Sequence, residues 1–223
     1  MSPVLANLFL HYAFDVWMTR EHPHLPWCRY ADDGLIHCHT EAEAPALKAA
    51  FQVRLAECRL EMHPDKIKIA YCKDSNRKED YANKKFNFLG YTFRPTLAIN
   101  PKQNKVFVAF LPRVSTTALK SMRQAVHDLG VLRRTQHELA DIARHLNPLL
   151  TGWLNYYGRY TPSTMDRFWR WINAQLMAWI MRKYKRYTRR KIKVSRLLTL
   201  IASRNHRMFV HGHRTAVGAY AFA

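Results

Sequence analysis

Two adjacent carboxylates, Asp32 and Asp33, are the residues of this sequence whose types and spacing could do chemistry. They follow Tyr30 and Ala31, and apolar and aromatic residues flank the four on both sides. Because Asp and Gly form turns and Tyr, Leu and Ile suit strands, residues 27–36 are predicted to form a β-hairpin with the acids at its tip. Such a tip could hold two carboxylates close enough to share a divalent cation, and Mg²⁺ prefers oxygen ligands. Asp-Asp-Gly is also typical of a solvated turn, and these residues alone favour that simpler interpretation.

The elements that must position this tip are predicted from apolar spacing and turn residues. Ser2-Pro3 is a typical helix start, and apolar residues at helical spacing then predict an amphipathic helix as far as Trp17. The remaining predictions for this half are a helix over residues 41–59, a polar mobile loop over 73–85, and strands over 67–71, over 86–93 (closed by Pro95) and over 106–111. This order of helices and strands is typical of an α+β layer.

After Pro112 the periodicity becomes helical throughout. Residues 115–129 are predicted to form a helix that starts at a Ser cap and ends at Gly130. A second helix covers 135–146 with Glu138 in a capping box, Pro148 opens a third, and a short amphipathic piece covers 194–202. The longest helix is predicted over 163–185, with an apolar stripe formed by Met165, Phe168, Trp169, Ile172, Leu176, Trp179 and Ile180.

Charge divides the chain at about the same place. The formal net charge is +20; residues 1–112 carry 15 Lys and Arg against 12 Asp and Glu, whereas residues 113–223 carry 21 against 4. A basic half rich in aromatic residues predicts a nucleic-acid partner rather than a membrane surface. No apolar run reaches the ~20 residues that span a bilayer. The four cysteines have no zinc-site spacing, which favours a reduced, intracellular protein.

Five stretches of the sequence occur together in one order: Ser2-Pro3-Val4-Leu5-Ala6-Asn7-Leu8-Phe9-Leu10, Tyr30-Ala31-Asp32-Asp33, His63-Pro64-Asp65-Lys66, Phe88-Leu89-Gly90-Tyr91 and Leu149-Leu150-Thr151-Gly152-Trp153-Leu154-Asn155-Tyr156-Tyr157. In this register the sequence resembles the bacterial group II intron-encoded reverse transcriptases/maturases over nearly its whole length. The resemblance implies an α+β fold: the C-terminal part of a reverse-transcriptase palm at 1–112, an all-α thumb or maturase-specific domain at 113–185, and a basic nucleic-acid-binding tail at 186–223.

The resemblance also implies residue roles. Asp32 and Asp33 match the palm aspartates that hold Mg²⁺ in a two-metal site, and Tyr30 matches the aromatic residue near the primer terminus. Lys66 matches a lysine near the leaving pyrophosphate, for which we hypothesise a general-acid role. The primer-grip region is matched by Phe88, Leu89, Gly90 and Tyr91. The implied partners are intron RNA, a DNA target or primer and deoxynucleoside triphosphates, in the bacterial cytoplasm.

RNA-binding candidates are concentrated in the basic half: Arg159, Arg182, Lys183, Lys185, Arg186, Arg189, Arg190, Lys191 and Lys193. Residues 182–196 hold nine basic residues and no acid, and a merely solvated helix face would suffer repulsion between its like charges. The aromatic residues of the 153–157 stretch are expected in a helix core, with Asn155, Arg159 and Tyr160 as better surface candidates. For His211 and His213 an ordinary polar tail is favoured over a metal site.

The sequence also departs from the family. A further metal-binding aspartate and the fingers lie upstream of the first helix in that family, and the sequence begins after them; the HNH nuclease of some relatives is absent too. We therefore expect an N-terminally truncated RNA-directed DNA polymerase that does not polymerise alone. The alternatives are a non-catalytic intron-RNA-binding maturase fragment and a decayed product that folds poorly because its first helix lacks a cover for its apolar face.

Overall fold

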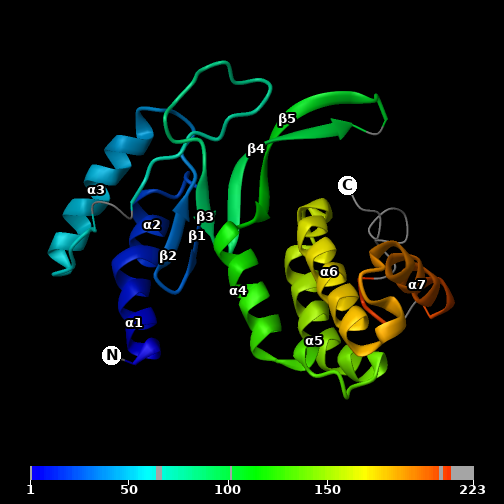
Figure 1. Ribbon diagram of the computed structural model, residues 1–223. Helices are drawn as coiled ribbons and strands as arrows, with labels where there is room; N and C mark the ends of the chain where they lie inside the picture. The colour runs from blue at the N-terminus through cyan, green and yellow to red at the C-terminus, as the bar shows by residue number, and fades with distance from the viewer. Residues whose placement is uncertain (1, 64–66, 101, 206–207, 212–223) are drawn as a thin grey trace. The chain divides into compact units, whose positions relative to one another are not determined.

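The computed structural model describes residues 2–63, 67–100, 102–205 and 208–211 (Figure 1). The chain divides into two compact units: unit 1 comprises residues 1–71 and 81–86, and unit 2 comprises residues 72–80 and 87–223. Helices combine with small antiparallel sheets, in agreement with the predicted α+β class. The domain boundaries predicted at residues 112 and 185 stay predictions. Within the described ranges, no helix has the length and apolar character needed to cross a bilayer.

Unit 1 begins with one helical segment made of α1 (Pro3–Leu10), a π-helical turn η1 (His11–Asp15) and α2 (Val16–Glu21). The predicted helix is therefore present, and Ser2 is its N-cap residue without a side-chain cap bond. In its first turns the apolar residues of the predicted face are exposed, namely Val4, Leu5, Leu8, Phe9 and Tyr12, as expected for a helix whose apolar face lacks a cover. The buried side chains are Ala13, Phe14 and Met18.

The predicted hairpin is confirmed as β1 (Trp27–Tyr30) paired antiparallel with β2 (Asp33–Ile36). The predicted second helix is confirmed as α3 (Glu43–Glu57). The hairpin and both helical segments share a small core that contains Phe14, Met18, Leu25 and Leu47, with Trp27 and Phe51 packed against it. The strand predicted at 67–71 is wrong: this segment has no strand pairing, and Tyr71 N–H donates to the Asn83 carbonyl at 2.8 Å instead.

Unit 2 contains a long antiparallel hairpin formed by β4 (Tyr91–Asn100) and β5 (Lys105–Val114), with the short β3 (Phe86–Phe88) beside β4 (Figure 1). The single strand predicted at 86–93 is thus wrong, because Leu89 and Gly90 turn the chain with φ angles of 49° and 78°. Pro95 does not close the strand and pairs with Phe110 inside β4. A residue without N–H is tolerated there because β3 is too short to pair with this outer part of β4.

The helical part of unit 2 consists of α4 (Thr116–Asp128), η2 (Val131–Arg133), α5 (Leu139–Tyr157), η3 (Pro162–Met165), α6 (Asp166–Lys183), η4 (Lys185–Tyr187) and α7 (Lys191–Arg204). The Ser115 cap is confirmed, since its side chain accepts the Ala118 N–H at 3.0 Å. Gly130 ends α4 with a φ of 65°.

Three predictions about the next helices are wrong: which helix is the longest, where Pro148 lies, and which position Glu138 takes in the capping box. Residues 139–157 form one helix of 19 residues, longer than the 18 residues of α6, and Pro148 lies inside it instead of opening a new one. The helix continues past the exposed Pro148 because Leu146 and Leu150, on either side, are anchored in the same core. Glu138 is the N-cap residue itself, and Asp141 completes the capping box.

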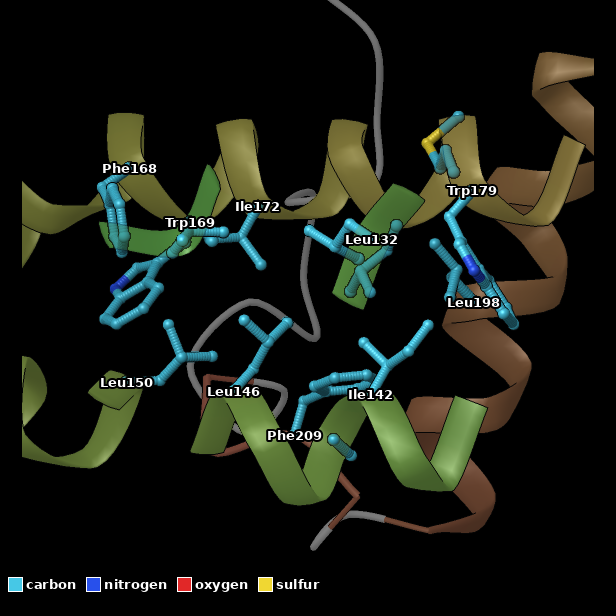
Figure 2. Packing of buried hydrophobic residues seen from close by; sticks show 14 of the residues in the cluster. Leu132, Ile142, Leu146, Leu150, Phe168, Trp169, Ile172, Trp179, Leu198 and Phe209 are labelled. Carbon is cyan, nitrogen blue, oxygen red and sulfur yellow. The ribbon is translucent and has the colours of Figure 1, made fainter. Parts of the chain in front are cut away.

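The main core lies between α5, α6 and α7, whose apolar side chains point toward one another (Figure 2). The apolar stripe predicted on the 163–185 helix is confirmed, because each of its seven residues is at most 2% exposed. Burying one such side chain contributes about 1.5–3 kcal/mol. The packing of α5 against α6 and α7 therefore stabilises α6, and the basic stretch begins at the C-terminal end of this helix.

Candidate functional site

The carboxylate pair lies at the hairpin tip, where it was predicted. Tyr30 pairs with Asp33 across the strands, and Ala31 and Asp32 form the connection, with Ala31 at a φ of 54°. Asp32, Asp33 and Tyr30 are all exposed. No other described residue makes a hydrogen bond or ion pair with either carboxylate. Their oxygens are therefore accessible to a ligand from solvent.

Arg29 joins this tip to the first helical segment. Its guanidinium donates to both carboxylate oxygens of Asp15 at 2.7 Å, to Asn7 Oδ1 at 2.9 Å and to the Ala31 carbonyl at 2.7 Å. Both charged partners are largely buried, with 12% and 17% of their side chains exposed. The hydrogen bonds from Arg29 lower the pKa of Asp15, and Asp15 in turn raises the pKa of Arg29. The sequence reasoning missed this arginine, although it directly precedes Tyr30.

The tip offers some, but not all, of the ligands that a divalent cation needs. Two exposed carboxylates supply hard oxygen ligands, which suit Mg²⁺, and water or phosphate oxygens complete such shells. In the described ranges, no group of three or more His, Cys, Asp or Glu side chains is placed to bind a metal ion. Lys66, the predicted general acid, lies outside the described residues.

Two of the sequence motifs meet inside unit 2. The Tyr91 hydroxyl donates to the Tyr156 carbonyl, and the Tyr156 hydroxyl donates to the Leu89 carbonyl at 2.9 Å. The Tyr91 ring lies 5.3 to 5.8 Å from those of Tyr156, Tyr157 and Tyr160. The end of α5 therefore holds the turn between β3 and β4 in place.

This contact explains why Gly90 stands at the turn. A Cβ atom there would lie 2.5 Å from the Tyr157 hydroxyl, and the φ of 78° disfavours any side chain. Tyr91 is buried, and burial raises its pKa to about 12. Phe88, Leu89 and Gly90 are half-buried, and contact of the four predicted primer-grip residues with a primer stays a prediction.

The basic residues of the 182–196 stretch follow the end of α6. Six of the predicted RNA-binding residues there are exposed, namely Lys185, Arg186, Arg189, Arg190, Lys191 and Lys193. Arg182 is exposed but donates to the Leu132 carbonyl at 2.6 Å. The Lys183 ammonium, with 13% of its side chain exposed, bonds Glu138 at 2.6 Å. Arg182 thus holds the end of α6 to η2, and Lys183 holds it to the start of α5.

Aromatic rings lie among these cations. The Arg186 guanidinium lies 4.9 Å from the centre of the Tyr187 ring and 5.9 Å from that of Tyr184. After Asp166 the sequence contains no further acid. Cations beside aromatic rings, without competing carboxylates, form a surface suited to phosphates and to stacked bases.

Two protein-family models match the chain. The reverse transcriptase (RNA-dependent DNA polymerase) model matches residues 1–93, and the group II intron maturase-specific domain model matches residues 119–197. The two ranges follow each other in the predicted order and cover most of the chain. The chain belongs to the group II intron-encoded reverse transcriptases/maturases. No curated protein matches it.

The two candidate sites fall within the ranges of different family models. The carboxylate pair falls inside the range of the reverse-transcriptase model, and the chain is an RNA-directed DNA polymerase by family. The basic stretch, residues 182–196, lies entirely within the maturase-specific range. A reverse transcriptase joined to a maturase domain acts in intron splicing and mobility, with intron RNA and other nucleic acids as its substrates.

A smaller surface of this maturase lies at the end of α5. Asn155, Arg159 and Tyr160 are exposed, as predicted, and the Arg159 guanidinium lies 5.9 Å from the centre of the Tyr160 ring. Trp153 packs against the core, as expected, whereas Tyr156 is 47% exposed.

One histidine differs from its prediction. His211 does not belong to a polar tail, because it is fully buried. Its ring stacks on Trp169, and its Nε2 lies 2.8 Å from Asn173 Oδ1. His206 and His213 lie outside the described residues.

Proposed function

We propose that this chain binds intron RNA through the exposed cations of the basic segment, residues 182–196. The observation that carries the proposal is the exposure of six cations beside two tyrosine rings, without an acid in the segment. Unpaired cations at short spacing repel one another, and a polyanion removes that cost. Arg186 is the best placed to pair with a phosphate, since its guanidinium already lies against the Tyr184 and Tyr187 rings.

The test is a quadruple alanine variant of Arg186, Arg189, Arg190 and Lys191. Each phosphate contact changes the slope of log K against log salt by about 0.7 to 0.9, so losing four contacts flattens the slope by about 3. Affinity for intron RNA is measured at several salt concentrations by filter binding or fluorescence anisotropy.

A matched control removes the same charge elsewhere. The control variant replaces four exposed cations outside the segment: Arg20, Lys68, Lys78 and Lys85. Net charge falls equally in both variants, and we expect the control to keep nearly the whole slope. Equal losses in the two variants would show that bulk charge, rather than this segment, binds the RNA.

We also propose that Asp32 and Asp33 hold Mg²⁺ for polymerisation of deoxynucleotides on a primer. Support comes from their exposed oxygens at a hairpin tip whose backbone is bound by Arg29: the guanidinium donates to the Ala31 carbonyl. When bound, divalent metal ions align the attacking and leaving oxygens of phosphoryl transfer. Tyr30, 65% exposed beside the pair, would contact the primer terminus, and Lys66 would serve the leaving pyrophosphate.

Primer extension with Mg²⁺ separates the polymerase from a non-catalytic RNA-binding maturase. From the sequence we expect no incorporation by the 223 residues alone. Incorporation that is abolished by Asp32→Asn would refute this expectation and would establish the catalytic role. In a complete homologue, the variant equivalent to Lys66→Ala is expected to slow nucleotide addition, and an unchanged rate would remove the general-acid hypothesis.

A further inference from the structure

Arg29 stands one residue before the hairpin tip and contacts three separate segments of unit 1. It reaches Asn7 in α1, Asp15 in η1 and the carbonyl of Ala31 in the tip itself. We call this set of bonds the Arg29 clamp. An arginine side chain offers five N–H donors in a rigid planar fork, and lysine cannot reproduce that geometry.

The clamp acts on a strained part of the tip. Ala31 adopts a φ of 54°, a left-handed conformation that an alanine avoids in an isolated chain. The Arg29 guanidinium donates to the carbonyl of this residue at 2.7 Å, so the bond helps hold the conformation from which Asp32 follows. The direction in which the two carboxylates leave the tip therefore depends on the clamp.

The positive charge of Arg29 could also affect cation binding by Asp32 and Asp33. A free guanidinium three residues before Asp32 would compete with a divalent cation for the two carboxylates. Asp15 prevents this, because both its oxygens bind Arg29 at 2.7 Å in a largely buried pair. Arg29 can thus hold the tip without cancelling the negative charge of Asp32 and Asp33.

We infer that Arg29 is a positioning residue that sets the divalent-cation affinity of the Asp32–Asp33 pair through the backbone of Ala31. The inference rests on the proposed metal role of that pair. Groups that orient metal ligands cost about 10–100-fold in affinity when they are lost.

The test measures Mn²⁺ binding to the full chain by electron paramagnetic resonance. Four proteins are compared: the wild type, Asp32→Asn, Arg29→Lys and the control Arg54→Lys. Arg54 is a matched arginine of unit 1, since it also donates to helix carbonyls, those of Ala13 and Tyr12, at 3.4 and 3.2 Å. Arg29→Lys is expected to weaken Mn²⁺ binding at least tenfold, as Asp32→Asn does, whereas Arg54→Lys leaves it unchanged.

A double variant separates position from charge. Arg29→Met with Asp15→Asn removes the ion pair without changing the net charge. We expect this protein to bind Mn²⁺ as weakly as Arg29→Lys, because the clamp is gone. Recovery of wild-type affinity in the double variant would overturn the positioning role. Circular dichroism checks that each variant folds; if Arg29→Lys does not, Asn7→Ala removes one bond of the clamp and must still weaken binding several-fold.

The outcomes distinguish this inference from the proposed metal site. If the wild type and Asp32→Asn bind Mn²⁺ equally, the metal role of the pair fails and the inference falls with it. If Asp32→Asn loses binding while Arg29→Lys and Arg54→Lys both keep it, the metal site stands and the role of Arg29 is refuted.

Discussion

Acidification is expected to destabilise unit 2 through His211. This imidazole is fully buried, lies nearly parallel to the Trp169 ring at 8° and 5.3 Å, and has Asn173 Oδ1 2.8 Å from its Nε2. Burial disfavours the charged form and lowers the pKa of His211 from 6.5 to about 4. The folded protein therefore keeps the ring neutral at a pH where the unfolded chain would protonate it.

The sign and size of the effect follow from this difference in pKa. Between pH 6.5 and 4 the unfolded state binds the extra proton, so the free energy of unfolding falls as the pH falls. Each pH unit costs up to about 1.4 kcal/mol, which sums to about 3 kcal/mol over the interval. The stability is fully present above pH 6.5 and does not fall further below pH 4 on account of this group. Such a loss is a large fraction of the ~5–15 kcal/mol typical of a domain.

Urea unfolding followed by tryptophan fluorescence measures this dependence at pH values from 7.5 to 4. His211→Gln removes the titrating group, and we expect a shallower loss of stability with acid than in the wild type. His145→Gln serves as the control, because His145 is exposed on α5. If the wild type and His211→Gln lose stability in parallel across the interval, the buried ring is not the origin of the acid sensitivity.

Two further predictions concern packing in unit 2, each with a control from the same unit. Gly90→Ala is expected to destabilise by about 1–3 kcal/mol, because its φ is 78° and its Cβ would meet the Tyr157 hydroxyl, whereas Gly152→Ala meets nothing within 4 Å and should stabilise α5 by about 0.5–1 kcal/mol. Leu146→Ala should cost about 2–5 kcal/mol because Leu146 is fully buried, while Leu200→Ala, at a position 45% exposed, should cost far less. Thermal or urea unfolding measures all four variants, and equal effects within either pair would contradict the packing described.

Several secondary-structure elements of this protein were predictable from residues that are close together in the sequence. Turn residues between strand formers predicted the 27–36 hairpin with its two acids, and the Ser115 cap and Gly130 stop predicted α4. The apolar stripe of α6 was also predictable, since an amphipathic helix turns its one wide apolar face toward the core. The order of the motifs predicted the family that the two domain models show.

Other features depended on partners that are distant in the sequence. Pro148 is a helix start by local rules, yet the shared core on both sides of it keeps α5 continuous. The alternating segment 67–71 resembles a strand but has no strand beside it. The sequence around His211 is typical of a polar tail, whereas in the structure its ring packs against Trp169 and lies within hydrogen-bond distance of Asn173.

The carboxylate pair shows the same division. The sequence by itself determined that Asp32 and Asp33 lie at a hairpin tip, because turn and strand propensities act over a few residues. Only the tertiary structure decided that Arg29 fastens this tip to Asn7 and Asp15. Those bonds join residues up to 22 positions apart, and no local pattern specifies which distant acceptors a side chain will meet.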